Sequence, residues 1–301
     1  FPDSLAASSL SGIEGNAPIV LTDKYALSDE TRRVINDTLS AGKVIIVGNE
    51  YAVSDEVEAQ IAALPSVSEI ERIGGVDRQE TAELIYSERL GNHSSTAIIA
   101  RCGLFADSLS ISPWAAATHS PIFLTEFGET SLTQETQDAL AAGDFDRVVI
   151  VGDAYAVSAR AAEEARIAAG VPYSQVVRLG GIDRFDTSSL IAAWTTSADR
   201  SDGDRLTWEK PAITRGDLHA DALTGGALQG RDRSPILLTT TGAPHEAVLP
   251  HIASHDGDIA EIRFFGDHYS IGHETIKGFV SVLTYDTLVW RPDESVAIDL
   301  S

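Results

Sequence analysis

The chain repeats itself, and this repetition restricts its fold more than any other feature of the sequence. FPDSL at residues 1–5 returns as FADSL at 105–109 and as HADAL at 219–223, so the units lie about 104 to 114 residues apart. Two more segments recur in the same order. They are APIVLT at 17–22, SPIFLT at 120–125 and SPILLT at 234–239, then VIIVGNEYAVS at 44–54, VVIVGDAYAVS at 148–158 and IRFFGDHYSIG at 262–272. This period predicts three homologous modules.

A glycine-containing turn marks where the second and third units begin. RIGGVDRQETA occupies residues 72–82 and RLGGIDRFDTS occupies 178–188, whereas no copy precedes the first FPDSL. We therefore predict repeat one at 1–70, N-terminally incomplete, repeat two at 71–176, repeat three at 177–283, and a tail or linker at 284–301. The polar stretch 197–210 predicts a surface insertion. Trp290 either docks the tail as a final strand or lies in a linker.

Within each unit, short apolar runs rich in β-branched residues alternate with alanine-rich stretches of helical length. Examples of the runs are TAIIA at 96–100, PIFLT at 121–125 and RVVIV at 147–151. This alternation predicts βαβ units, and the nearly continuous apolar character of the strands predicts parallel sheets covered by helices. The expected fold class is therefore α/β, with Rossmann-like or flavodoxin-like modules. Helix N-caps are predicted at four positions, Asp77, Asp183, Ser54 and Ser158.

The charge of the chain argues against some partners. Its formal net charge is −23 and its pI is about 4.5, which is the wrong sign for long-range attraction to nucleic acid or to an anionic membrane. No apolar run is long enough to span a membrane, and the segment FPDSLAASSL lacks the basic region of a signal peptide. Cys102 is the single cysteine, which excludes an intrachain disulfide and a multi-cysteine metal site.

The ordered set R-x-G-G-x-D-R-x-x-T, F-x-D-S/A-L, P-I-x-L-T and V-G-x-x-Y-A-V-S resembles the cell wall binding repeat 2 family over residues 1 to about 283. The resemblance implies three compact α/β modules around a pseudo-threefold axis. It also implies a secreted protein of a Gram-positive cell surface or S-layer, held non-covalently on an anionic polymer of the cell wall. The P-I-L-L stretch of the family maps onto residues 18–21, 121–124 and 235–238. The chain departs from the family at Tyr51, Tyr155 and Tyr269, where a small residue is more usual.

The arginines of the opening turn are the first candidates for ligand binding, because the resemblance maps them onto Arg72, Arg78, Arg178 and Arg184. A guanidinium near a helix N-terminus attracts phosphate or carboxylate even in an acidic protein, since charges are screened over about 8 Å at physiological salt. The alternative is structural. The same arginines then pair with Asp77 and Asp183 or join adjacent modules.

Four further residues are secondary candidates. Arg101 and Arg215 directly follow a predicted strand, at the carboxyl edge where open α/β sheets bind ligands. Asp107 and Asp221, equivalent to Asp3 of repeat one, could contact a hydroxyl of the ligand, although their position at a helix start favours capping.

Signals for enzymatic chemistry are weak. GGALQGRD at 225–232 lacks the Lys and Ser/Thr of a P-loop, and Cys102 has no counterpart in the other repeats, which favours a core position. His245, His251 and His255 lack the HExxH spacing, which favours a solvated histidine face. We predict no catalytic residue, no cofactor and no metal site. Three hypotheses follow, in this order: a non-catalytic anchor on a wall glycopolymer, a surface-layer or filament subunit that contacts other surface-protein chains, and a sugar- or nucleotide-processing enzyme.

Overall fold

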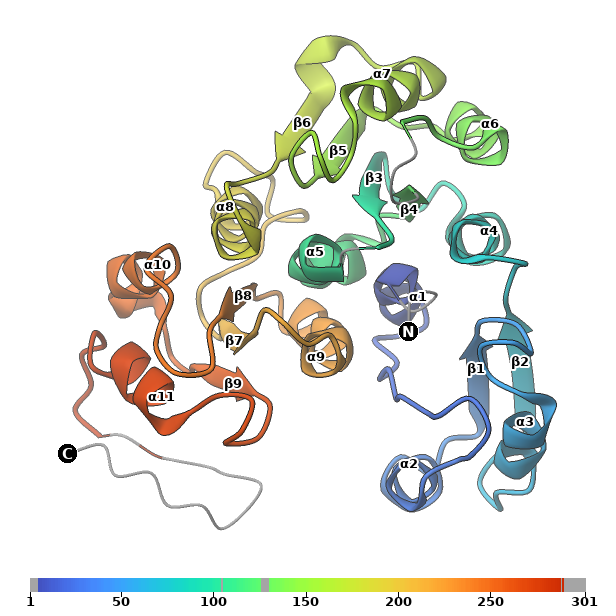
Figure 1. The fold of residues 1–301 in the computed structure, drawn as a ribbon, viewed down its shortest axis with the longest axis horizontal. Helices are drawn as coiled ribbons and strands as arrows, with labels where there is room; N and C mark the ends of the chain where they lie inside the picture. Colours follow the sequence, from blue (N-terminus) through green and yellow to red (C-terminus); the bar gives the residue numbers. More distant parts are fainter. Residues whose placement is uncertain (1–4, 104, 126–129, 288, 290–301) are drawn as a thin grey trace.

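All strands of the described chain lie in parallel sheets. A computed structural model describes residues 5–103, 105–125, 130–287 and 289. The first sheet pairs β1 (Lys43–Val47) with β2 (Glu69–Ile73). The second has the order β4 (Ile122–Thr125), β3 (Thr96–Arg101), β5 (Arg147–Val151), β6 (Val176–Leu179), and the third has the order β8 (Ile236–Thr239), β7 (Ala212–Arg215), β9 (Arg263–Phe265). The predicted α/β class with three parallel-sheet modules is confirmed (Figure 1).

Helices alternate with these strands and cover the sheets (Figure 1). The helices are α1 (Ala7–Ile13), α2 (Asp29–Arg33, continued by a π-helical turn over Val34–Thr38), α3 (Asp55–Ala62), α4 (Arg78–Ile85, continued by a π-helical turn over Tyr86–Leu90), α5 (Phe105–Thr118), α6 (Gln134–Ala142), α7 (Ala159–Ala168), α8 (Arg184–Thr196), α9 (Ala220–Arg231), α10 (Leu249–Ser254) and α11 (His273–Val280). No helix among the described residues is both long enough and apolar enough to cross a lipid bilayer.

The predicted N-caps are confirmed at three of four positions. The Oδ1 atom of Asp77 accepts from two backbone amides at the start of α4, each at 2.9 Å. Asp183 does the same at the start of α8, at 2.8 Å. Ser158 accepts from the Ala161 amide at 3.0 Å. Ser54 occupies the N-cap position of α3, but its side chain makes no capping hydrogen bond.

Each Arg-Gly-Gly turn carries the chain from one module into the next. The strand before the turn belongs to the preceding sheet, because β2 pairs with β1 and β6 pairs with β5. The helix after the turn packs on the following sheet, α4 against β4 and α8 against β8. The boundaries predicted at 70/71 and 176/177 therefore fall inside β2 and β6, and the division into repeats stays a prediction.

Three equivalent helices, α1, α5 and α9, meet at the centre of the molecule, and the sheets lie outside them (Figure 1). The helices approach closely because their facing residues are small. A Cβ on Gly226 would lie 2.2 Å from Ser112 Oγ, and a Cβ on Gly12 would lie 2.0 Å from the Ala116 carbonyl oxygen. Ser8, Ser112 and Gly226 are equivalent positions of the three repeats, so the repeated segments build a pseudo-threefold axis.

We expect Gly12→Ala to lower the free energy of unfolding by about 1 to 3 kcal/mol. Alanine ordinarily favours a helix by about 1 kcal/mol over glycine, but the added methyl group collides with backbone of α5, which cannot rotate away. Gly42→Ala is the matched control, because the nearest heavy atom to its Cβ lies 3.9 Å away. Denaturant unfolding measures both variants. Equal stability of the two would contradict close packing at the axis.

The segment 197–210 is exposed over residues 198–199 and 201–203, as predicted for a polar surface insertion, but its other part packs into the molecule. Its Leu206 and Trp208 are buried, and its Arg200 guanidinium lies 3.8 Å from the ring centre of Trp194 and 4.9 Å from that of Trp114. Burial lowers the pKa of Arg200 to about 10. The polar composition of the segment gave no indication of these contacts. They arise because the segment packs against α5 and α8 where the two helices meet. Trp290 lies outside the described residues.

Candidate functional site

Two glycine-containing loops meet at the carboxyl edge of each of the first two sheets. The turn of residues 72–78 lies on the loop after β1, where a Cβ on Gly74 would lie 2.2 Å from the carbonyl carbon of Gly48. In the second module, a Cβ on Gly180 would lie 2.4 Å from that of Gly152. The first glycine of each turn therefore permits this backbone contact. The paired loops form an edge that is the same in both modules.

Arg72 and Arg178 stabilise these loops through hydrogen bonds to backbone carbonyl oxygens. Arg72 Nη1 donates to the carbonyl oxygens of Gly48 and Val53, each at 2.9 Å, and its Nε donates to Glu58 at 3.0 Å. Arg178 Nη1 donates to three carbonyl oxygens at 2.9 to 3.0 Å, those of Gly152, Asp153 and Val157. Both arginines thus fix the loop of their own sheet.

Arg78 and Arg184 are the first residues of α4 and α8, and each contacts the loop after β3 or β7 in the module on which its helix packs. Arg184 Nη1 donates to the carbonyl oxygen of Gly216 at 2.5 Å, and its guanidinium lies 6.0 Å from the ring centre of Phe105. Arg78 Nη1 lies 3.7 Å from the sulfur of Cys102, the position equivalent to Gly216. Asp77 and Asp183 serve as helix caps. Phe105 belongs to the second module and Arg184 to the third, so the contact between them favours the joining of modules over pairing with Asp183. Ligand binding by the four arginines stays a prediction.

Asp107 is a buried acid at the carboxyl edge of the second sheet. It is 7% exposed, and a Cβ on Gly152 would lie 2.7 Å from its Oδ2 atom. Burial, together with the nearby charge of Asp153, raises the pKa of Asp107 to about 6, while Arg184 and Arg101 oppose the shift. Three predicted site residues therefore interact here, because the charges of Arg101 and Arg184 both act on the carboxyl group of Asp107.

The third module repeats this arrangement in a more open form. Burial raises the pKa of Asp221, as does the charge of Asp267, and Arg215 opposes the rise. Arg215 also binds Asp217 through two hydrogen bonds of 2.6 and 2.7 Å. The expected capping role is wrong for Asp221, because the N-cap of α9 is His219 and Asp221 is the second residue of the helix. Asp107 likewise lies inside the first turn of α5.

The sequence analysis did not select the exposed apolar and aromatic residues of these loops as site residues, although it noted the tyrosines as departures from the family. The tyrosine of each VG-x-x-Y loop projects into solvent, and so does the aliphatic residue of each Gly-Gly turn. The exposed fractions are 74% for Tyr51, 93% for Tyr155, 74% for Tyr269, 85% for Val76 and 94% for Ile182. The signal that could have revealed them is the recurrence of the same apolar residue types in solvent loops.

The three tyrosines are held by the same local turn. The side chain of the residue two positions earlier accepts a hydrogen bond from each tyrosine amide: Asn49 at 3.0 Å, Asp153 at 2.9 Å and Asp267 at 3.1 Å. Such a turn fixes the backbone before any ligand arrives. Each module thus presents one exposed aromatic ring on a fixed backbone turn beside the carboxyl edge of its sheet.

The histidines of repeat three do not form the predicted solvated face. His255 stacks on Trp208 at 4.2 Å between ring centres, and His245 stacks on Phe185 at 4.1 Å. The described residues contain no group of three His, Cys, Asp or Glu side chains that could hold a metal ion. Residues 225–231 are helical within α9, as expected if their similarity to a P-loop is accidental.

The repeated edge with its arginine turns corresponds to a known family. Residues 1–58, 72–162 and 178–276 match the family described as cell wall binding domain 2, CWB2. The chain belongs to this family. The three matched ranges coincide with the three repeats, so CWB2 membership applies to every module. It indicates a cell wall or cell surface location, with a polymer of the wall as partner.

Curated relatives and solved structures agree with this CWB2 assignment. The chain is 29% identical over 224 residues to an amidase enhancer of Bacillus subtilis, covering 74% of this chain and 27% of the relative. It is 28% identical over 242 residues to the N-acetylmuramoyl-L-alanine amidase LytC of the same organism, covering 79% and 43%. The chain spans less than half the length of either relative.

The fold is that of two solved Clostridium difficile proteins. Cwp8 superposes with a TM-score of 0.78 at 26% identity, covering 94% of this chain and 45% of Cwp8. Cwp6 superposes with a TM-score of 0.77 at 23% identity, covering 95% and 43%. Both likenesses extend over nearly the full chain, which supports the three-module arrangement described above.

Proposed function

We propose that this CWB2 chain is a non-catalytic anchoring module that holds an anionic cell wall glycopolymer along the carboxyl edges of its sheets. The observation that carries the proposal is the repeated edge itself. Each module presents an exposed tyrosine in the loop at the carboxyl edge of its sheet, Tyr51, Tyr155 and Tyr269 in turn. Aromatic rings with a polar tip suit contact with sugar faces, because they bury apolar area and keep a hydrogen-bonding hydroxyl.

Three such sites on one chain favour a polymeric partner. A repeating glycopolymer that contacts two or three edges gains affinity through effective concentration, although each single contact is weak. The net charge of −23 does not prevent this, because charges are screened over about 8 Å at physiological salt and Arg78, Arg184 and Arg215 supply local positive charge at the carboxyl edges. Arg72 and Arg178 contribute indirectly, by fixing the loops that carry the tyrosines.

A catalytic role has less support. A carboxyl group with a raised pKa can serve as a general acid, but Asp107 is buried against Gly152 and therefore poorly placed to reach a polymer. The names of both curated relatives contain the word amidase, yet this chain covers 27% and 43% of their lengths. We therefore expect no release of sugar or peptide when the chain is incubated with purified walls.

We expect the triple variant Tyr51→Ser, Tyr155→Ser, Tyr269→Ser to bind purified Gram-positive cell walls about tenfold more weakly in a sedimentation assay, a loss of about 1.4 kcal/mol. Tyr173→Ser is the control, because Tyr173 is comparably exposed at 71% but precedes β6, at the opposite edge of its sheet from these loops. The tyrosine variant is a better test than substitution of Arg72 and Arg178, because loss of those arginines would also remove the hydrogen bonds that fix the loops. Unchanged retention of the triple variant would contradict the proposal.

The identity of the polymer is tested by the wall preparation. Walls stripped of phosphate-bearing secondary polymer by hydrofluoric acid should lose the bound chain, while peptidoglycan remains in the pellet. Equal binding to stripped and intact walls would rule out an anionic polymer as the ligand. It would instead point to the peptidoglycan or to surface protein chains.

A further inference from the structure

Lys24 lies beside two exposed tyrosine rings of the first module. Its Nζ atom is 4.7 Å from the ring centre of Tyr25 and 5.8 Å from that of Tyr51. Both rings project into solvent, with exposed fractions of 70% and 74%. An ammonium group within about 6 Å of an aromatic ring centre is attracted to the face of the ring. The three side chains therefore form one group, which we call the Lys24 cluster.

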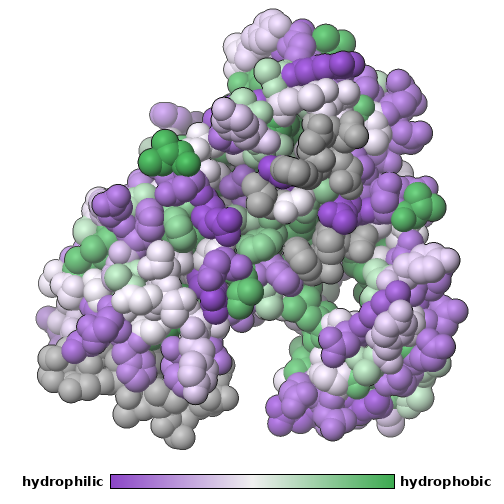
Figure 2. Space-filling view, viewed as in Figure 1, coloured by the Kyte–Doolittle hydropathy of each residue, from purple (hydrophilic) through white to green (hydrophobic). Residues whose placement is uncertain are grey.

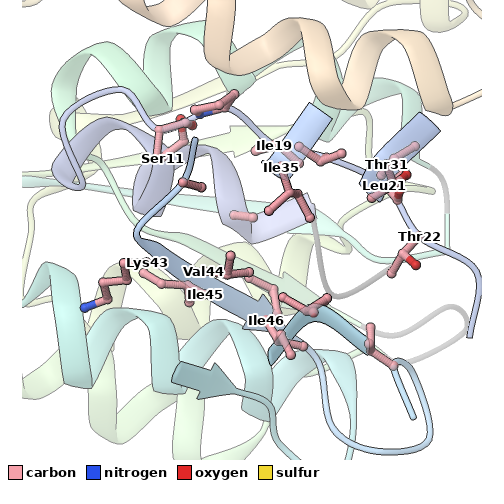
Figure 3. Close-up of a pocket in the computed structure, with 18 of the residues that line it drawn as sticks. Ser11, Ile19, Leu21, Thr22, Thr31, Ile35, Lys43, Val44, Ile45 and Ile46 are labelled. Carbon is pink, nitrogen blue, oxygen red and sulfur yellow. Dashed lines mark hydrogen bonds between the residues drawn. The ribbon is translucent and has the colours of Figure 1, made fainter. Parts of the chain in front are cut away.

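The Lys24 cluster belongs to the carboxyl edge of the first sheet. Figure 3 shows Thr22 and Lys43 at opposite sides of the pocket between residues 17–22 and β1. Lys43 is the first residue of β1, so Lys24, two residues beyond Thr22, lies towards the end of the strand. The amide of Ser54, the N-cap residue of α3, donates to the Lys24 carbonyl oxygen at 2.9 Å. This bond fixes the backbone of Lys24 against the segment that follows Tyr51.

The ammonium group of Lys24 forms no ion pair with an acid among the described residues. Acids are plentiful, because the net charge is −23 and hydrophilic residues cover most of the visible surface of the first module (Figure 2). Lys43, by contrast, pairs with Glu71 at 2.7 Å. Even Asp23 and Glu50, which are next to the cluster in sequence, do not pair with Lys24. An ammonium group has three N–H donors, so Lys24 can donate to a ligand while it stays beside the rings.

The corresponding edges of the other modules are less favourable to an anion. The side chain that accepts from the tyrosine amide is the neutral Asn49 in the first module, but it is a carboxylate in the others, Asp153 and Asp267. In the third module Thr241 takes the place of Lys24, because its carbonyl oxygen accepts from the N-cap amide of α11 at 2.9 Å in the same way. The edge of the first module therefore suits an oxyanion better than the edge of the third.

We propose that the Lys24 cluster binds a sugar unit that carries a phosphate or carboxylate group, with the oxyanion on Lys24 and the sugar ring on the tyrosines. This assignment rests on the proposed anchoring function, because it names the group of the polymer that one edge recognises. The tyrosines supply apolar area and hydroxyl groups, and the ammonium group supplies charge-assisted hydrogen bonds. Lys24 is then the residue that selects an anionic polymer over a neutral one, and Tyr25 is a further binding residue.

Wall binding by charge variants tests this role of Lys24. We expect Lys24→Gln to bind intact walls about fivefold more weakly than the parent chain in about 50 mM salt. The difference should vanish in about 1 M salt, because exposed charges are then screened over about 3 Å. Lys24→Arg keeps the charge and should bind like the parent. Lys210→Gln is the matched control, because it removes the same charge two residues before β7, at the amino edge of the third sheet.

The outcome that contradicts the role of Lys24 differs from the one that contradicts anchoring. If the parent binds walls and Lys24→Gln binds equally well at low salt, the proposed selectivity is wrong and the anchoring function stands. A loss that is the same at low and high salt would also exclude an ionic contact. It would show that Lys24 acts only by packing on the rings.

A titration with small sugars decides the proposal even if the parent fails to bind walls. Glucose 6-phosphate, glucuronate and glucose are added in turn to the ¹⁵N-labelled chain, and the amide resonances of residues 24, 25 and 51 are followed by NMR. We expect saturable shifts with the anionic sugars, a roughly fivefold weaker response to glucose, and loss of this preference in Lys24→Gln. A response to only one anionic sugar would identify phosphate or carboxylate as the group. Equal responses to all three sugars, or none, would overturn the proposal. Selective shifts in a chain that does not bind walls would support the oxyanion site and refute anchoring.

Discussion

Trp114→Ala is expected to lower the free energy of unfolding by about 3 to 5 kcal/mol, the range observed when a large buried aromatic side chain is removed. Trp114 is 1% exposed within the central helix α5. Its ring lies edge-on to Trp194 at 5.1 Å, and its Nε1 donates to the Asp204 carbonyl oxygen at 2.6 Å. One side chain therefore joins α5, α8 and the segment 197–210.

Denaturant unfolding followed by far-UV circular dichroism measures this loss. Trp114→Phe is the control, because phenylalanine keeps much of the buried area but lacks the N–H group. Its cost should be about 1 to 2 kcal/mol, which corresponds to one lost hydrogen bond and a small cavity. If Trp114→Ala and Trp114→Phe cost the same, the hydrogen bond to Asp204 dominates and the role of packing at this junction is refuted.

The fold could be predicted because repetition supplies the same information three times. The apolar runs, the glycine turns and the caps at Asp77 and Asp183 are local features that act within a few residues. The central axis was implied only by the family resemblance. Its physical basis, the small residues Ser8, Ser112 and Gly226 at equivalent positions, is evident once the helices are seen to meet.

Residues 17–22 show where local sequence stops being sufficient. APIVLT closely matches SPIFLT, whose residues 122–125 form β4, yet residues 17–22 form no strand. A strand is defined by hydrogen bonds to a neighbour, and the neighbour that β4 has in β3 has no counterpart in the described part of repeat one. The same apolar sequence thus takes two forms because its partner differs, which local propensity cannot encode.

The sequence could predict which residues belong to the candidate site, but not the directions in which their side chains point. The sequence analysis selected the arginine turns and the acidic residues of the F-x-D segment. It could not show that Arg72 bends back onto the loop after β1, whereas Arg184 bonds to Gly216 in the loop after β7. These directions depend on contacts between segments 24 and 32 residues apart, which local sequence does not reveal. The exposed tyrosines were noticed only as departures from the family.

The burial of Asp107 leads to the second large effect, because a buried acid with a raised pKa destabilises the folded state at neutral pH. The folded pKa of about 6 exceeds the ordinary value of 3.8. The folded state therefore binds more protons than the unfolded state between about pH 4 and pH 6, and stability falls as the pH rises through this window. A difference of about two pKa units corresponds to about 3 kcal/mol.

Asp107→Asn removes this titration while keeping the shape of the side chain. At pH 7.5 the variant should be more stable than the parent by up to about 3 kcal/mol, and near pH 4 the two should converge. Unfolding free energies of both proteins, measured every half pH unit between pH 4 and pH 7.5, give the difference in stability as a function of pH. Asp144→Asn, at an exposed position, serves as the control for the chemical change itself. A parent that is more stable than Asp107→Asn at pH 7.5 would show that Arg101 and Arg184 stabilise the carboxylate more than burial destabilises it. Asp107 would then be an ionised member of the charged edge, and a role in polymer binding would gain support.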